Sequence, residues 1–289
     1  MLKIIEKSKI WISISLIIIV IGLGFTCFKG LNFGIDFKGG SQVSIQLNED
    51  INKDDVDTIV KQYAPDSSTT ISNTYEYEIK STDLDSDKLS SIMTELKDKY
   101  SLDDTALISQ EEIGAAIGKE LTRNSLLAIL AASAVMLIYV AIRFEFKFGI
   151  AALIATLHDV LITITVYAVF GIPVNTPFIA AILTVVGYSM NDTIVIFDRI
   201  RENSKKMRRA DTVEVANTSI SETLTRSINT SLSTLVTIIA INILVPSVRE
   251  FTIPLIVGVV CGAYSSIFIA SPVWVFLKEK AGKKKVKNA

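Results

Sequence analysis

Six long apolar segments constrain the fold of this chain more than any other feature of its sequence. The hydrocarbon core of a bilayer is about 30 Å thick and a helix rises about 1.5 Å per residue, so roughly 20 apolar residues cross it. The mean hydropathy of +0.44 is also far above that of a soluble domain. The sequence therefore predicts a polytopic α-helical membrane protein with six transmembrane helices, at about residues 10–28, 125–142, 149–170, 177–198, 227–246 and 251–277.

Basic residues between these segments predict how the helices are oriented. They cluster in residues 3–9, at Arg143 and Lys147, over 199–209, and from Lys278 onward. Cytoplasmic loops carry the excess of Lys and Arg in membrane proteins, so we expect both termini in the cytoplasm. No small-x-small cleavage site follows the first segment, which favours an uncleaved transmembrane helix.

The acid-rich region between the first two apolar segments has the pattern of a small α+β domain. Strands and helices follow one another in the order βαββαβ, which is typical of a ferredoxin-like unit. The expected elements are a strand at 41–47, a helix at 53–63, strands at 67–72 and 75–80, a helix at 87–100 and a strand at 105–110.

These patterns divide the chain into four parts. Residues 1–28 are the cytoplasmic N-terminus and first transmembrane helix, and 29–112 the extracytoplasmic α+β domain. Residues 113–277 hold transmembrane helices 2–6, and 278–289 are a basic cytoplasmic tail. The outer domain opens with a glycine-rich motif that contains Gly34, Asp36, Gly39 and Gly40. This motif predicts a turn with unusual backbone dihedrals at the membrane surface.

Two apolar segments carry carboxylates at depth. Asn191 and Asp192 lie in the fourth segment, and His158 and Asp159 lie about ten residues, or about 15 Å, into the third. A carboxylate inside a bilayer costs about 2.5–3.5 kcal/mol on insertion scales, and such groups mark ion or proton pathways. We predict a functional role for Asp192, whereas Asp159 could also serve only to pair helices and His158 could be a satisfied core residue.

The fifth segment carries a polar stripe. Arg226, Asn229, Thr230 and Ser233 are spaced i, i+3, i+4 and i+7, which places them on one helical face. Arg226 could snorkel to the cytoplasmic surface, and the Ser/Thr residues could simply pack tightly between helices. We expect this face to meet the polar groups of the third and fourth helices. Gly258 and Gly262 in the sixth segment form a GxxxG pair, which predicts close helix contact.

These motifs together resemble the SecF family, the smaller subunit of the SecD–SecF membrane complex, related to the RND superfamily of proton-driven transporters. The match rests on residues 33–40 (Phe-Gly-Ile-Asp-Phe-Lys-Gly-Gly), 158–159 (His-Asp), 187–203, 224–227 with 230–231, and 264–272.

The resemblance implies a role in protein export that uses the proton motive force during or after SecA-driven export. It maps a proton-carrying aspartate to Asp192 and its cationic partner to Arg226, with Asn191, Asp159 and His158 as further members of the pathway. It implies a separate SecD chain, the SecYEG translocon with YajC and YidC, and an unfolded preprotein substrate. It implies neither a cofactor nor enzymatic activity.

Three alternatives remain open from the sequence. One is half of an RND-type small-molecule exporter, which would need a second half. Another is an intramembrane aspartyl protease built on Asp159 and Asp192, although that chemistry needs carboxylates that share a proton and no Gly-x-Gly-Asp motif surrounds either residue. The third is a passive assembly scaffold.

Overall fold

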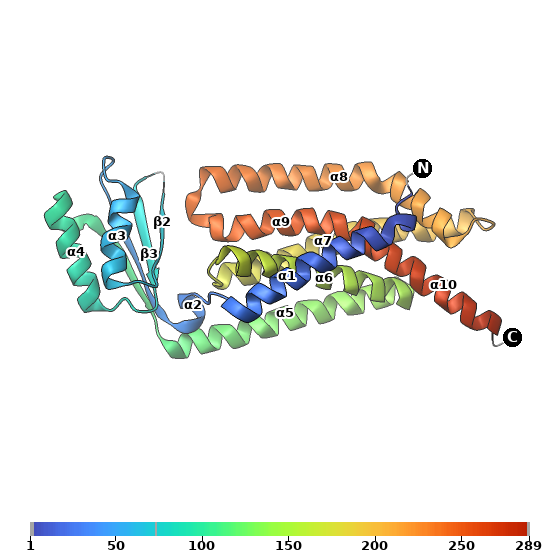
Figure 1. Cartoon of the computed structure of the whole chain (residues 1–289), viewed down its shortest axis with the longest axis horizontal. Helices are drawn as coiled ribbons and strands as arrows, with labels where there is room; N and C mark the ends of the chain where they lie inside the picture. The colour runs from blue at the N-terminus through green and yellow to red at the C-terminus, as the bar shows by residue number, and fades with distance from the viewer. Residues whose placement is uncertain (1–2, 73, 288–289) are drawn as a thin grey trace.

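The computed structural model describes residues 3–72 and 74–287, with only the backbone described for 115, 137, 141 and 282–287. A helical bundle and a small sheet domain lie end to end along the long axis of the molecule (Figure 1). Six helices in the described part are long and apolar enough to cross a membrane. The predicted number of transmembrane helices is therefore confirmed.

The bundle helices extend beyond the apolar segments because they end at capping residues and turns rather than where hydropathy falls. Asp211, for example, accepts a hydrogen bond from the Glu214 backbone N–H at 2.7 Å and so starts α8 well before its apolar part. The helices are α1 (Ser8–Lys29), α5 (Ala115–Arg143), α6 (Phe146–Phe170), α7 (Thr176–Lys206), α8 (Thr212–Leu244) and α9 (Arg249–Ser265), which continues through a π-helical turn (Ser266–Ala270) into α10 (Ser271–Lys287).

The sheet domain contains the six elements that the sequence predicts, in the predicted order. Its four strands are arranged β2-β3-β1-β4, and every neighbouring pair is antiparallel. The elements are β1 (Gly40–Gln46), α3 (Lys53–Tyr63), β2 (Ser68–Ile71), β3 (Glu76–Ser81), α4 (Ser86–Tyr100) and β4 (Leu107–Ile113).

Alternating residues of the central strands form the core of this domain. Val43 and Ile45 of β1 face Ile79 and Tyr77 of β3 in register, and all four are fully buried. The apolar faces of α3 and α4 cover them, because both helices bury residues at helical spacing. The alternating apolar residues of the strands and the helically spaced apolar residues of α3 and α4 thus form one hydrophobic cluster.

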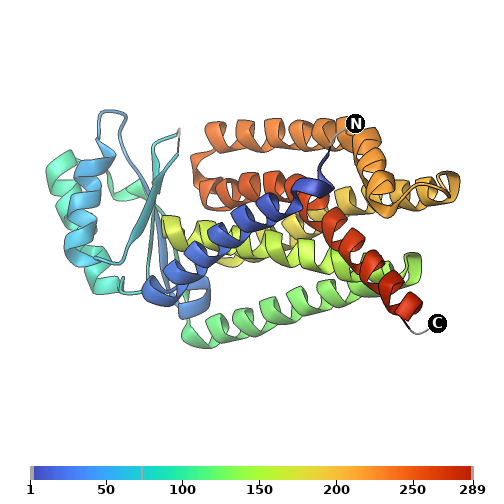
Figure 2. The same ribbon diagram turned by 45° about the vertical axis from the view of Figure 1, so that its right-hand side comes forward.

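Glycine allows α7 and α9 to approach each other closely. A Cβ atom on Gly258 would lie 2.1 Å from Val185 Cγ2, and one on Gly262 would lie 3.1 Å from the Ser189 Cα atom. The GxxxG prediction is therefore confirmed. By contrast the middle of α5 stands away from the other helices in both views (Figures 1 and 2), although one of its ends contacts α2 and the other contacts α6 and α7. Among its side chains that the structure describes, none in the most apolar 18-residue window is buried.

The glycine-rich motif forms a short helix, α2 (Ile35–Lys38), where we expected only a turn. The unusual dihedrals are confirmed at its end, since Gly39 has φ +87° and Gly40 has φ +147°. Gly34 has an ordinary φ of −83°. The motif lies where the sheet domain meets the bundle, whereas both chain termini lie at the opposite end of the bundle (Figures 1 and 2).

Candidate functional site

Asp159 lies at the centre of the bundle and is fully buried. Its Oδ2 accepts hydrogen bonds from Ser189 of α7 at 2.5 Å and from Ser265 of α9 at 2.6 Å. Its Oδ1 lies 2.8 Å from His158 Nδ1. One carboxylate thus connects three helices, and donors on both oxygens offset much of the cost of burying it.

A second layer of hydroxyl groups adjoins this carboxylate at the π-helical turn. Ser266 Oγ lies 2.8 Å from Thr193 Oγ1 and donates to the Ser189 carbonyl at 3.3 Å. Within the π-turn the Ser266 carbonyl also accepts a hydrogen bond from Ser271 Oγ at 3.0 Å. Such turns are common at functional sites in membrane and soluble helices. The hydroxyl network therefore runs from Asp159 to the residue that follows Asp192.

His158 is linked to the first helix through Tyr264. The two rings stack with centroids 6.0 Å apart. Tyr264 donates to the Trp11 carbonyl at 2.8 Å and accepts from Ser15 at 3.3 Å. His158 is itself buried, at 7% exposed. The structure therefore brings His158 and Asp159 together in one polar cluster, as the sequence suggested.

Asp192 occupies a separate environment, between α7 and α8. It is 2% exposed, yet the hydrogen bond that its Oδ2 accepts from Ser231 Oγ is a long one, at 3.5 Å. The Thr230 side chain also interacts with it, and Arg226 attracts it electrostatically. No ion pair of 4.0 Å or less joins Asp192 to Arg226 in the described part of the chain. Asp192 is therefore the more weakly satisfied of the two buried carboxylates.

The polar stripe on α8 does not face the interior of this chain as we expected. Arg226, Asn229 and Ser233 are exposed, and only Thr230 is half-buried. At this level of α8 the buried hydroxyls belong to Ser227 and Ser231, which lie nearly opposite Asn229 and Ser233 at about 100° per residue. The expected helix interface through Asn229 and Ser233 is thus wrong within the chain, because periodicity defines a stripe but not the direction in which it points.

Asn191 is also exposed, although its neighbour Asp192 is buried. Adjacent residues on a helix point about 100° apart, and here that rotation turns Asp192 into the bundle and Asn191 out of it.

The two aspartates do not form a shared-proton pair. Their hydrogen-bond partners are entirely different, and no hydrogen bond joins the carboxylates within the described residues. The arrangement that an aspartyl protease requires is therefore missing from the described structure. The same residues offer no group of three or more His, Cys, Asp or Glu side chains placed to hold a metal ion.

Charged residues at the far end of α7 form ion pairs with neighbouring helices. Arg199 pairs with Glu222 of α8 at 2.6 Å, and Asp198 pairs with Arg201 at 3.0 Å and with Arg143 of α5 at 3.5 Å. These pairs are partly exposed. Partly exposed ion pairs of this kind are typical of a solvated helix end.

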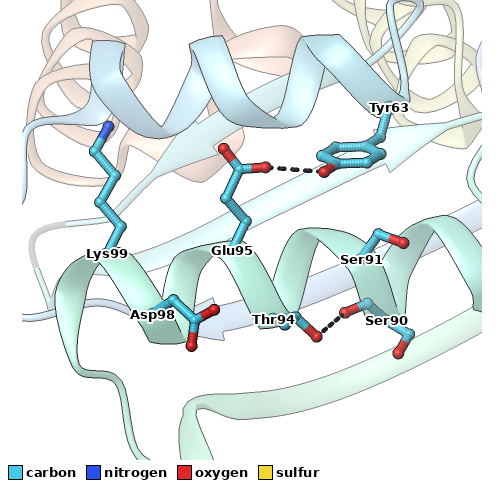
Figure 3. Close-up of a pocket in the computed structure, with 7 residues that line it drawn as sticks. All are labelled: Tyr63, Ser90, Ser91, Thr94, Glu95, Asp98 and Lys99. Atoms are coloured by element: carbon cyan, nitrogen blue, oxygen red, sulfur yellow. Dashed lines mark hydrogen bonds between the residues drawn. The ribbon is translucent and has the colours of Figure 1, made fainter.

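The sheet domain carries a shallow, open depression between α3 and α4 (Figure 3). Tyr63 donates a hydrogen bond to Glu95 at 2.9 Å across it, and Asp98 and Lys99 lie along its α4 side. It lies on the side of the domain that faces away from the bundle (Figure 1). It is therefore unconnected to the buried carboxylates.

The described part of the chain combines six helices long and apolar enough to cross a membrane, two buried carboxylates and a small antiparallel α+β domain. These features define a polytopic membrane protein with ionisable groups inside its bundle. Residues 92–280 match the C-terminal model of the protein export membrane proteins SecD and SecF, and residues 24–51 match the SecD/SecF GG motif. The chain belongs to the SecD/SecF family.

Relatives include both single subunits and fusions. The protein translocase subunit SecF of Sebaldella termitidis is 39% identical over 98% of this chain and 96% of its own length. SecDF of Bacillus subtilis is 35% identical over 96% of this chain but only 38% of its own length. The crystal structure of SecDF from Thermus thermophilus, titled a translocon-associated membrane protein, superposes with a TM-score of 0.82 at 34% identity. That superposition covers 96% of this chain and 39% of SecDF.

Sequence reasoning missed the partners that complete the buried sites. Ser189 and Ser265 lie within the recognised motifs, but nothing local connects them to Asp159, 30 and 106 residues away. Ser231, which donates to Asp192, lies on the face of α8 opposite the polar stripe, and its i, i+4 spacing from the buried Ser227 was the only local sign of that face.

Proposed function

We propose that this chain is the SecF-type subunit of the Sec translocase accessory complex and that it uses the proton motive force to promote protein translocation. The observation that carries the proposal is Asp192, a buried carboxylate that has the hydroxyl groups of Ser231 and Thr230 as partners, the first at a long 3.5 Å, and no cation within 4.0 Å among the described residues. Its proton pathway comprises Asp192 and Arg226, with Asn191, Asp159 and His158 as further members.

The energetics favour a protonation switch at Asp192. An ionised carboxylate in a low-dielectric site is costly unless it is paired, and uptake of a proton removes that cost. The charged form attracts Arg226 on α8, so each proton that enters or leaves changes the force between α7 and α8. A proton that crosses the membrane gains about 2.3 kcal/mol per 100 mV, which is enough to bias a two-state arrangement by about fiftyfold.

The outward polar stripe on α8 supports a second membrane subunit as partner. Arg226, Asn229 and Ser233 would face lipid if this chain were alone, and polar side chains in a bilayer face protein or water. We propose that a SecD chain covers this face, in keeping with the SecD–SecF fusions among the relatives. SecYEG, YajC, YidC and the unfolded preprotein are the further partners of this proposal.

The proposed topology follows from charge and from the strand order. The basic end of the bundle, with both termini, lies in the cytoplasm, and the sheet domain lies outside as a ferredoxin-like unit. The chain then divides as the sequence suggests, into 1–28, 29–112, 113–277 and 278–289. In this arrangement the chain acts by movement, not by an enzymatic reaction.

Gradient-dependent export in inverted membrane vesicles tests the function. Asp192→Asn should abolish the gradient-dependent part of export while leaving ATP-driven export and complex assembly intact. Asp198→Asn is the matched control, because Asp198 lies on the same helix but is partly exposed and ion-paired. Gradient-dependent export at the normal rate by Asp192→Asn would falsify the proposal. Purification without an accompanying SecD or SecY would favour a small-molecule exporter.

A further inference from the structure

The N-terminus of α7 is capped by a residue from a distant part of the chain. The N-cap residue Asn175 makes no side-chain capping bond. Instead Asp36 Oδ2 accepts a hydrogen bond from the Thr176 backbone N–H at 2.7 Å, across 140 positions of sequence. In α3, α4 and α8 the N-cap residue supplies its own capping side chain. The capping contact of α7 therefore also joins two segments of the protein.

Backbone hydrogen bonds hold the same two segments in register. Val174 donates to the Asn32 carbonyl at 2.7 Å and accepts from the Gly34 backbone N–H at 3.0 Å. A Cβ atom on Gly34 would lie 1.9 Å from Asn175 Oδ1. Glycine here makes room for the Asn175 side chain and is not needed for an unusual dihedral. The segment before α2 and the loop between α6 and α7 form one rigid junction.

The other end of α2 leads into the sheet without a loop. Gly39 donates to the Ile35 carbonyl at 2.8 Å, and β1 begins at Gly40. A Cβ atom on Gly40 would lie 2.4 Å from the Ser81 carbonyl oxygen of β3. Because no flexible loop separates α2 from β1, a displacement of α2 is passed on to the sheet.

We propose that Asp36 is a positioning residue that couples α7 to the sheet domain, so that displacement of α7 moves the sheet. The inference rests on the proposed function, because α7 is the helix that carries Asp192. Sixteen residues, or about 24 Å of continuous helix, separate Thr176 from Asp192. A helix of this length moves as a rod, so a shift at Asp192 reaches the capped end.

A second contact between the bundle and the sheet is looser, which gives the coupling a direction. Glu250 at the start of α9 accepts a hydrogen bond from Ser68 of β2 at 3.4 Å. α7 is thus attached closely to α2, which leads directly into the sheet, whereas α9 has a longer contact with β2 of the sheet itself. A shift of α7 relative to α9 would therefore tilt the sheet domain about the α9 contact.

Two measurements on the full chain in its complex test this coupling. One is gradient-dependent export in inverted vesicles. The other is the distance between spin labels at Thr94→Cys on α4 and Thr184→Cys on α7, in a background with Cys27→Ala and Cys261→Ala, measured by pulsed electron paramagnetic resonance. Thr94 and Thr184 are both exposed. The distance measurement needs no gradient, so it reports on the junction even if the proposed function fails.

Asp36→Ala should broaden the distance distribution and reduce gradient-dependent export at least about fivefold, the factor by which loss of a typical cap weakens a helix terminus. Asp36→Asn should retain both properties, because asparagine is an equally good capping residue. Asp36→Gln carries an amide as Asp36→Asn does, but glutamine is a poor capping residue. It replaces Asp36→Ala if the alanine variant does not accumulate. The matched control is Asp85→Ala, which removes a 2.8 Å cap within the sheet domain and should leave the distance unchanged.

Normal distance distributions in Asp36→Ala and Asp36→Gln would overturn the proposal. So would a broadened distance with normal gradient-dependent export, because the contact would then be purely structural. If Asp192→Asn also exports normally, the proposed function fails, and the distance measurement alone decides whether Asp36 holds the junction.

Discussion

Asp192 and Arg226 lie on adjacent helices without forming an ion pair. The carboxylate is buried between α7 and α8, whereas the guanidinium group is on the exposed side of α8 and acts on it only from a distance. The charge of Arg226, rather than a fixed hydrogen-bond geometry, is therefore what reaches Asp192. This arrangement suits a carboxylate that takes up and loses a proton repeatedly, because no Asp192–Arg226 ion pair has to be broken each time.

The first prediction concerns that long-range attraction. Arg226→Lys keeps the positive charge and should retain most gradient-dependent export, because no bidentate geometry has to be matched. Arg226→Gln removes the charge, and gradient-dependent export should fall about tenfold or more. Export in inverted vesicles measures both. If lysine is as defective as glutamine, the working state contains a specific guanidinium–carboxylate bond that is absent from the described structure.

The second prediction concerns the donors to Asp159. Ser265→Ala removes the 2.6 Å hydrogen bond to a fully buried carboxylate and should destabilise the bundle by about 1–3 kcal/mol. Ser233→Ala is the control, since Ser233 is exposed and donates only within its own helix; its effect should stay within about 0.5 kcal/mol. Thermal unfolding of the purified protein in detergent distinguishes the two. Equal midpoints would mean that Ser265 is not needed to satisfy Asp159.

The third prediction concerns close packing of α7 against α9. Gly258→Ala places a Cβ atom 2.1 Å from Val185 Cγ2 and should cost about 1–3 kcal/mol through overpacking. Gly187→Ala on α7 has nothing within 4 Å of its new Cβ and should be neutral or stabilising by up to about 1 kcal/mol. The difference in Tm between these two variants isolates packing from helix propensity. A Gly258→Ala protein as stable as Gly187→Ala would show that the helices can separate without cost.

The fourth prediction concerns pH and the sheet domain. Burial raises the pKa of the Asp57 carboxyl, but hydrogen bonds from Lys53, Tyr77 and Thr69 outweigh it, so the pKa lies below the ordinary value of 3.8. A carboxyl with a lowered folded pKa stabilises the domain above its unfolded pKa, and this contribution is lost as pH falls through the folded value. We expect the domain to lose stability below about pH 4.

Substitution separates this group from the other carboxylates of the domain. At about pH 7, Asp57→Asn should destabilise the domain by about 1–3 kcal/mol, and its remaining stability should vary less with pH than that of the parent. Asp55→Asn, an exposed neighbour, is the control. Pulsed hydrogen–deuterium exchange of β2 and β3 across a urea series measures each. An unchanged pH dependence in Asp57→Asn would assign the acid sensitivity to other groups.

The sequence by itself determined the six membrane helices, the order and faces of the elements in the sheet domain, and the close approach at Gly258 and Gly262. Hydropathy, period-2 and period-3.6 patterns are local properties, so a single chain displays them. Even the stripe on α8 was identified correctly as one helical face.

Only the tertiary structure decided what those faces meet. Helical periodicity groups Arg226 with Asn229 and Ser233 but leaves the rotation of α8 undetermined, and the packing of α7 and α9 turned that stripe outward and Ser231 inward. The same holds for Asp159, whose donors come from two other helices, and for Asp36, whose hydrogen bond spans 140 residues. Such contacts depend on the rotation and depth of whole helices, which are set by the sum of all packing interactions and are not encoded by any one segment.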